Sequence, residues 1–79
     1  MTTIQLNGNP HPLVDGSTLS DLVATLTGRT LLPTGHPADG GRLGVAVALN
    51  AGIVPRSRWS ATGLQVNDEV EIVTAVQGG

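Results

Sequence analysis

Residues 3–7, which read TIQLN, alternate strictly between polar and apolar side chains. Because successive side chains of a β-strand point to opposite faces of a sheet, this alternation predicts a half-buried strand. An Asn-Gly pair follows at Asn7 and Gly8. Such a pair is a strong signal for a hairpin, so we expect the chain to reverse within NGNP. The return strand is expected over residues 11–14, where Pro12 lacks an N–H and therefore favours the edge of the sheet.

A helical period replaces this alternation over residues 17–28. The apolar side chains recur at intervals of three and four residues and form one stripe, made of Leu19, Leu22, Val23 and Leu26. Thr18 stands three residues before Asp21, the spacing of a capping box that satisfies free backbone N–H groups at a helix start. Gly28 suits the left-handed conformation that ends many helices. These features predict one amphipathic helix.

The segment 29–42 is rich in Gly and Pro and is predicted to form a long loop. Leu31 and Leu32 are candidate anchors of this loop to the core, with room for one short helical turn. The apolar run VAVAL that follows at residues 45–49 is typical of a central strand buried on both faces.

The turn NAG is expected to use Gly52 for a positive φ, and residues 53–55 are expected to form a short edge strand that Pro55 ends. A polar connector containing Trp59 comes next. Asn67 and Asp68 are then expected to turn the chain into a last strand, in which Val70, Ile72 and Val76 share one face.

The order of these elements is strand, strand, helix, strand, strand, strand. This order is the outline of an α+β fold of the β-grasp type, a mixed sheet of four or five strands with one main helix packed on one face. In that fold the first and last strands pair in parallel at the centre of the sheet. We therefore predict one β-grasp domain over residues 1–76 and a flexible C-terminal tail over residues 77–79.

Composition narrows the function classes. The chain has 79 residues, four arginines, no lysine, no cysteine and a net charge of −2, and Trp59 is its single aromatic residue. A protein that binds nucleic acid normally shows a basic excess and several aromatic side chains, so no nucleic-acid partner is expected. The start lacks the pattern of a signal peptide, and no apolar run approaches the length that spans a bilayer. We expect a soluble, cytoplasmic protein without a membrane partner.

The titratable residues suggest no catalytic constellation. His11 and His36 lack further ligands at the spacing of a metal site and are interpreted as plain loop residues. Asp21 is interpreted as a helix cap, and the other carboxylates as turn formers or as the wetted face of a strand. No glycine-rich stretch has the context of a phosphate-binding loop. The chain is therefore not expected to be an enzyme or to bind a metal or cofactor itself.

Two interpretations are possible for each of three large side chains in the polar connector, Arg56, Arg58 and Trp59. Trp59 is expected to cover one end of the core, with contact to a partner protein as the alternative. Arg56 and Arg58 are expected to be solvated, with guidance of an acidic partner surface as the alternative.

The sequence ends with Gly78 and Gly79 directly after the last predicted strand. A frayed terminus is the simplest interpretation. A functional interpretation is that two residues without side chains let a narrow channel in another protein admit the backbone and reach the terminal carboxylate. Gly79 is then the chemically reactive residue, with Gly78, Gln77 and Val76 as the residues that the partner binds.

Four stretches resemble the ThiS family of ubiquitin-like sulfur carriers in thiamine biosynthesis: IQLNG, STLSDLVATL, VAVALNAGIVPRSRW and VNDEVEIVTAVQGG. The resemblance covers nearly the whole chain, and its central stretch, with Asn50, Val54-Pro55-Arg56 and Trp59, is the most specific. The diglycine end is shared by ubiquitin-like carriers in general. The 29–42 loop looks longer than in compact relatives.

The resemblance implies a sulfur-transfer cycle. An adenylyltransferase of the ubiquitin-activating type would use ATP and Mg²⁺ to convert the Gly79 carboxylate to an acyl-adenylate. A sulfur donor protein would then replace the adenylate to give a thiocarboxylate, and thiazole synthase would take that sulfur. The alternatives are sulfur carriage for another pathway, such as molybdopterin or cysteine synthesis, and a protein modifier that is joined to lysines of a target.

Activation by a partner requires a contact surface on the carrier. We expect an exposed apolar patch on the sheet near the tail, with Val73 and Ala75 of the last strand as candidates. The sequence does not settle which face of the sheet is open.

Overall fold

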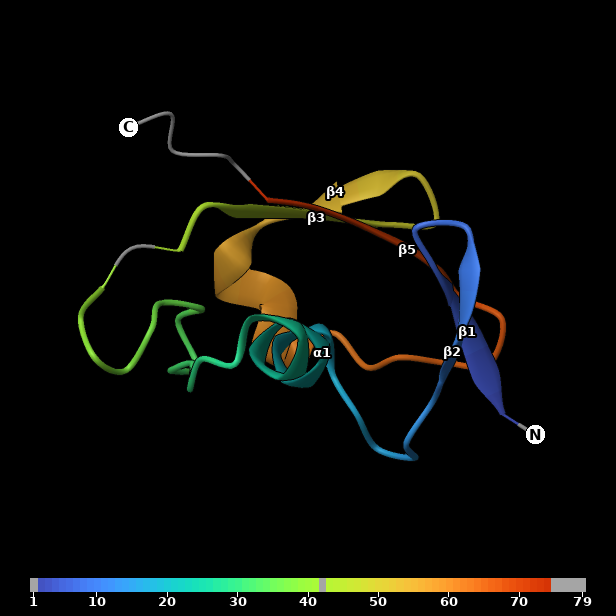
Figure 1. The fold of residues 1–79 in the computed structure, drawn as a ribbon, viewed down its shortest axis with the longest axis horizontal. Helices are drawn as coiled ribbons and strands as arrows, with labels where there is room; N and C mark the ends of the chain where they lie inside the picture. Colours follow the sequence, from blue (N-terminus) through green and yellow to red (C-terminus); the bar gives the residue numbers. More distant parts are fainter. Residues whose placement is uncertain (1, 42, 75–79) are drawn as a thin grey trace.

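The computed structural model describes residues 2–41 and 43–74. A twisted sheet forms one layer, and two helices pack against one of its faces (Figure 1). Along the chain the elements are β1 (Thr3–Leu6), β2 (Asn9–Pro12), α1 (Leu19–Thr27), β3 (Val45–Leu49), β4 (Gly52–Val54), the 3-10 helix η1 (Arg56–Ala61) and β5 (Glu69–Thr74).

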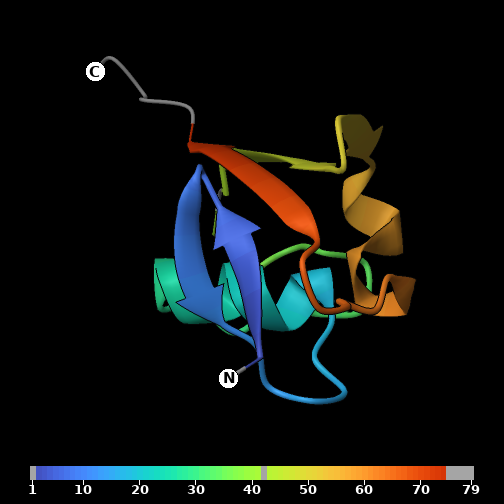
Figure 2. The ribbon, with the colours of Figure 1, turned by 90° about the vertical axis from the view of Figure 1, so that its right-hand side faces the viewer.

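The strands lie in the order β2-β1-β5-β3-β4, so the last strand in sequence occupies the middle of the sheet. β1 and β5 pair in parallel, and the other three strand pairs are antiparallel. Figure 2 shows β1 and β5 side by side, with β2 at the outer edge. The prediction of a mixed β-grasp sheet with a parallel central pair is confirmed, as are the edge positions of β2 and β4.

Both hairpins use turns of two residues, which corrects two predictions. Asn7 and Gly8 have φ angles of 50° and 83°, and Leu6 pairs directly with Asn9. β2 therefore begins at Asn9 and ends at Pro12, earlier than the expected strand over residues 11–14. The turn consists of Asn7 and Gly8 alone and not of the whole stretch NGNP.

The second hairpin turns at Asn50 and Ala51, with φ angles of 50° and 70°, and Leu49 pairs with Gly52. The expectation that Gly52 supplies the positive φ was wrong. The two-residue turn is complete before Gly52, which already belongs to β4.

The helix has the predicted caps. Asp21 N–H donates to Thr18 Oγ1 at 3.2 Å, Thr18 N–H donates to Asp21 Oδ2 at 2.9 Å, and Gly28 ends the helix in the left-handed conformation. Leu26, however, is 45% exposed and does not continue the buried stripe. A core of eight buried apolar residues is too small to cover the last turn of α1.

The core lies between the sheet and the two helices. Its buried residues come from nearly every element and are Ile4, Leu19, Leu22, Val23, Leu43, Val47, Trp59 and Val70. In β3 only Val47 is buried, and Ala46 is exposed, so the prediction of a strand buried on both faces was wrong. The run VAVAL is apolar throughout, but the helices cover one face of the sheet and leave the other open.

The segment after α1 folds without the short helical turn considered above. Leu31 and Pro37 instead form an isolated antiparallel bridge, and Leu32 N–H donates to the His36 carbonyl at 2.8 Å. Leu31 packs against the core as expected, whereas Leu32 is 45% exposed. In the described parts of the chain, no helix has the length and apolar character needed to cross a membrane.

Candidate functional site

The four residues predicted to carry or present the reactive group, Val76, Gln77, Gly78 and Gly79, lie outside the described residues, as does Ala75. The flexible tail and the domain boundary after residue 76 therefore stay predictions. The structure does describe β5, the strand that leads to this segment. The candidate site is accordingly built from β5 and the surfaces around it.

β5 is held on both sides in the middle of the sheet. Its pairing with β3 runs from the pair of Leu49 with Val70 to the pair of Val45 with Thr74. Its pairing with β1 consists of Gln5 with Glu69 and Leu6 with Val70. Val70 is 1% exposed and packs in the core. The strand that leads to the diglycine end is thus anchored by main-chain pairing and by core packing.

The face of the sheet opposite the helices is open and partly apolar (Figure 1). Val73 is 63% exposed and Ile53 is 76% exposed. Ala46 pairs with Val73, and Ala48 pairs with Ile53, so small side chains lie between these two larger ones. The expected apolar patch therefore exists in its described part, on the face that the helices do not cover. We call Ala46, Ala48, Ile53 and Val73 the outer patch.

Negative charge borders the outer patch. Glu69 and Glu71 are exposed and alternate along β5 in phase with Val73, so they share its face. The arginines that the structure describes, Arg29, Arg56 and Arg58, all lie outside the strands. This face is therefore suited to a partner whose surface is apolar at its centre and basic at its rim.

Trp59 is a core residue. It is 1% exposed, and its Nε1–H donates to the Val54 carbonyl at 3.1 Å. The expectation that Trp59 covers the core is confirmed, and the alternative of a partner contact was wrong because the indole is fully covered within the chain.

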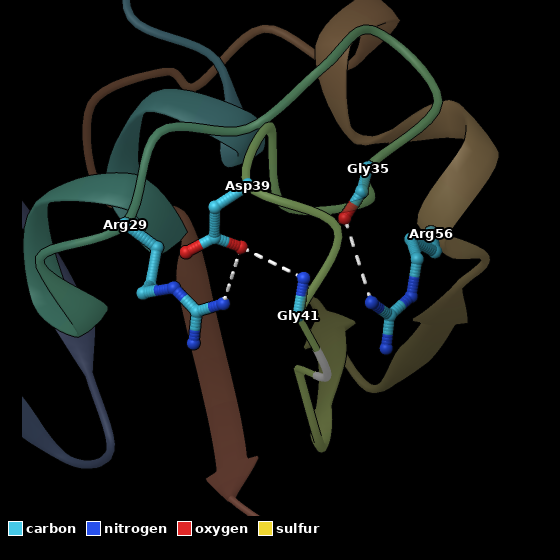
Figure 3. Close-up of polar contacts among 5 residues, drawn as sticks. All are labelled: Arg29, Gly35, Asp39, Gly41 and Arg56. Carbon is cyan, nitrogen blue, oxygen red and sulfur yellow. Dashed lines mark hydrogen bonds and ion pairs between the residues drawn. The ribbon is translucent and has the colours of Figure 1, made fainter.

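Arg56 is half-buried rather than solvated, which corrects the expectation for it. Its guanidinium lies over the Trp59 ring, with Cζ 5.3 Å from the ring centroid. Nη1 donates to the Gly35 carbonyl at 3.5 Å (Figure 3). Nη2 donates to the Leu43 carbonyl. Arg56, at the start of η1, therefore connects η1 to the loop after α1 through Gly35 and to the residues just before β3 through Leu43. Arg58, as expected, is exposed.

A second set of contacts closes the same segment on itself (Figure 3). Arg29 Nη2 and Asp39 Oδ1 form an ion pair at 2.9 Å, and the same oxygen accepts from Gly41 N–H at 2.8 Å. The Gly41 N–H and the Arg29 guanidinium lower the pKa of Asp39 below its ordinary value of 3.8. These contacts thus join the two ends of the loop formed by residues 29–41 to each other.

Gly35 allows this loop to approach Arg56 closely. It is buried with a φ of 86°, and a Cβ at this position would overlap the side chain and backbone of Arg56. Gly40 in the same loop has a similar φ of 78°, with nothing within 4 Å of its Cβ position. Substitution of Gly40 by alanine therefore tests backbone strain alone, whereas substitution of Gly35 tests backbone strain together with steric overlap.

We expect Gly40→Ala to cost about 1–2 kcal/mol, since alanine resists a left-handed φ. Gly35→Ala carries the same cost and about 1–3 kcal/mol more from overlap with Arg56. Urea unfolding of both variants measures the difference. Equal losses would show that residues 29–41 do not pack against Arg56 in solution.

The remaining candidates do not form a common site in the described structure. His11 lies in β2, not in a loop as expected, with Nδ1 2.9 Å from the Pro12 carbonyl oxygen, while His36 lies in the 29–41 loop. Asp68 Oδ2 accepts from Gln65 N–H at 2.8 Å, which confirms it as a turn former. Sequence reasoning missed the side chains of Asn7 and Asn50, which reach from the hairpin turns to the backbone of β5.

A family model described as the ThiS family matches residues 4–79. The chain belongs to the ThiS family. The match covers all the elements of the fold and includes the diglycine end. Membership of the ThiS family indicates a sulfur carrier of thiamine biosynthesis that interacts with partners in that pathway.

A solved structure agrees with this assignment. The chain is similar to the crystal structure of a thiamine biosynthesis protein (ThiS) from Geobacter metallireducens, with 26% sequence identity and a TM-score of 0.62. The likeness covers 98% of this chain and 99% of that chain. No curated protein matches the chain.

Proposed function

We propose that this ThiS-family protein carries sulfur as a thiocarboxylate on Gly79 and delivers it for thiazole formation in thiamine biosynthesis. The observation that carries the proposal is the family match, which runs from residue 4 through Gly79. The parallel β1–β5 pair supports it, since β5 leads directly into the segment that ends at Gly78 and Gly79.

The chemistry requires activation because a carboxylate is a poor electrophile. An oxygen of the Gly79 carboxylate attacks the α-phosphorus of ATP, and pyrophosphate leaves with its Mg²⁺. The terminal sulfur of a persulfide on the donor protein then attacks the acyl carbon, and AMP leaves, which gives an acyl disulfide. A second thiol of the partner proteins attacks the donor sulfur of this disulfide, so that the thiocarboxylate leaves on Gly79 and a disulfide forms between the two partner thiols. The chain has no cysteine to hold a persulfide. The C-terminal carboxylate is accordingly the proposed site of sulfur attachment, and the partner supplies ATP and Mg²⁺.

The carrier itself is proposed to perform no catalysis. Having neither lysine nor cysteine, the chain lacks the side chains that would most readily capture an activated acyl group. The activating enzyme is proposed to be an adenylyltransferase of the ubiquitin-activating type, which docks on the outer patch while it admits residues 76–79. Thiazole synthase is proposed to receive the sulfur.

Intact-mass measurement tests this function. The purified chain is incubated with ATP, Mg²⁺, an activating enzyme of this type and a sulfur donor. The expected product is heavier by the replacement of one oxygen with sulfur, and fragmentation places the change at Gly79. A chain that lacks Gly79 is the control and should stay unmodified. A full-length chain that stays unchanged with a partner active on its own carrier contradicts the proposal.

A genetic test separates thiamine from other sulfur pathways. Deletion of the gene is expected to cause a growth defect that the thiazole moiety alone corrects. Correction by cysteine, or by restoring molybdopterin, would assign the carrier to another pathway. High-mass adducts joined through Gly79 to lysines of other proteins would indicate a protein modifier.

A further inference from the structure

β5 is paired unequally on its two sides. β3 accompanies it as far as the Val45–Thr74 pair, whereas pairing with β1 stops at Leu6–Val70. Beyond Leu6 the first strand turns away at Asn7 and Gly8. From Ile72 onward, the side of β5 that faces β1 therefore has no strand beside it in the described structure.

The side chain of Asn7 takes the place of the missing strand. Ile72 N–H donates to Asn7 Oδ1 at 2.8 Å, and Asn7 Nδ2 donates to the Ile72 carbonyl at 3.2 Å. The main-chain N–H of Asn7 also donates to the Val70 carbonyl at 2.9 Å. Because a side-chain amide has the same donor and acceptor as a peptide group, Asn7 extends the β1–β5 ladder by one residue. Figure 2 shows the β1–β2 turn beside the upper part of β5.

Asn50 makes a matching contact at the other end of β5. Glu69 N–H donates to Asn50 Oδ1 at 2.9 Å, and Asn50 N–H donates to the Glu69 carbonyl at 2.7 Å. Asn7 and Asn50 both occupy the first position of a two-residue turn, with the same φ of 50°. Both side chains thus accept a hydrogen bond from a β5 N–H, Asn50 where β5 begins and Asn7 near where it ends. Asn50 Nδ2 donates to Asp68 Oδ1 at 3.2 Å, whereas Asn7 Nδ2 donates to β5 itself.

We propose that Asn7 is a positioning residue for the carrier's reaction. By holding Ile72 on the side of β5 that β1 leaves open, it fixes the direction in which β5 runs through Val73 and Thr74, the residues that lead toward Gly79 and the contact with the activating enzyme. This inference rests on the proposed function of Gly79. Ordering a backbone segment before it binds removes part of the entropic cost of binding. Asn50 acts at the start of β5 and has no such effect.

Substitution by glycine isolates the amide from the turn. Glycine adopts a positive φ without strain, so Asn7→Gly and Asn50→Gly keep both turns and remove only the side-chain contacts. We expect a similar decrease in the free energy of unfolding for the two variants. Amide exchange followed by NMR is expected to speed up at Ile72 in Asn7→Gly and at Glu69 in Asn50→Gly.

The decisive readout is the rate of pyrophosphate release by the activating enzyme as a function of carrier concentration. Asn7→Gly is expected to lower kcat/KM about tenfold, through a higher KM, because the end of β5 must then be ordered when the enzyme binds it. Asn50→Gly is expected to stay within about twofold of the natural chain. Asn7→Asp keeps an acceptor for Ile72 N–H but places its second carboxylate oxygen against the Ile72 carbonyl, so it should lower kcat/KM at least as much as Asn7→Gly.

Each outcome has a definite meaning. If the two glycine variants lower kcat/KM equally, or if Asn7→Gly leaves it unchanged, Asn7 serves stability alone and the positioning role is wrong. If the natural chain is not adenylated by a competent partner, the proposed function itself fails and the role of Asn7 fails with it. An unaltered exchange rate at Ile72 in Asn7→Gly would show that the amide contact does not hold β5 in solution.

Discussion

Trp59→Ala is expected to remove most of the stability of this domain. Trp59 is fully buried and is the largest side chain of the core, and its Nε1–H donates to the Val54 carbonyl. Replacing a buried tryptophan by alanine typically costs about 3–5 kcal/mol. Domains near this size have a total stability close to the lower end of about 5–15 kcal/mol. Far-UV circular dichroism during urea unfolding measures the loss without relying on the single aromatic residue.

Trp59→Phe separates packing from the hydrogen bond. Phenylalanine keeps an aromatic ring in the core, and Arg56 can still lie over that ring. It leaves the Val54 carbonyl without its hydrogen-bond donor. We expect a loss of about 1–3 kcal/mol, clearly smaller than that of the alanine variant. A Trp59→Ala chain within about 1 kcal/mol of the natural stability would contradict the position of Trp59 in the core.

Val73→Lys is expected to block activation by the partner while leaving the fold intact. The change places a charge within the outer patch, on β5, beside Ala46 and in phase with Glu71. A residue central to an interface contributes about 2 kcal/mol or more, which corresponds to a decrease in kcat/KM of about 30-fold or more. Since Val73 is already 63% exposed, the free energy of unfolding should change by no more than about 0.5 kcal/mol.

Val66→Lys is the matched control for this experiment. Val66 is also exposed, at 53%, but it lies in the connection before β5 and outside the sheet. Its rate of adenylation should equal that of the natural chain. A similar decrease in both variants would indicate a general effect of added positive charge, and no decrease in either would show that the partner docks elsewhere.

The elements of the fold could be predicted because their signals are local. The stripe of α1, the Thr18–Asp21 capping box and the Asn7-Gly8 turn each depend on residues a few positions apart. Apart from the exact positions of the two hairpin turns, the main errors concern what covers an element. VAVAL has the same apolar character whether helices lie on one face of a sheet or on two, so the exposure of Ala46 depends on the whole architecture. Leu26 fits the helical stripe equally well, but the small core ends before it.

The polar contacts that position the candidate site were beyond prediction for a related reason. Arg56 is charged, and the usual expectation for an isolated arginine is solvation. Its partners are carbonyl groups of Gly35 and Leu43, and a carbonyl has no signature in a sequence. Asn7 was recognised as a turn former, but its amide contacts Ile72, which is distant in the chain. Such contacts follow from the strand order, which sequence periodicity does not specify.

The central place of β5 has a consequence for how the carrier becomes competent. The β1–β2 and β3–β4 hairpins each join neighbouring segments and can form locally, but within the described sheet they are connected only through β5, which follows both of them along the chain. Pairings between such distant segments are slow to form. The sheet is therefore assembled around the strand that leads to the C-terminus, and a chain interrupted before residue 69 lacks the piece that unites its halves. Pairing of β5 with both hairpins is thus the step that completes the sheet.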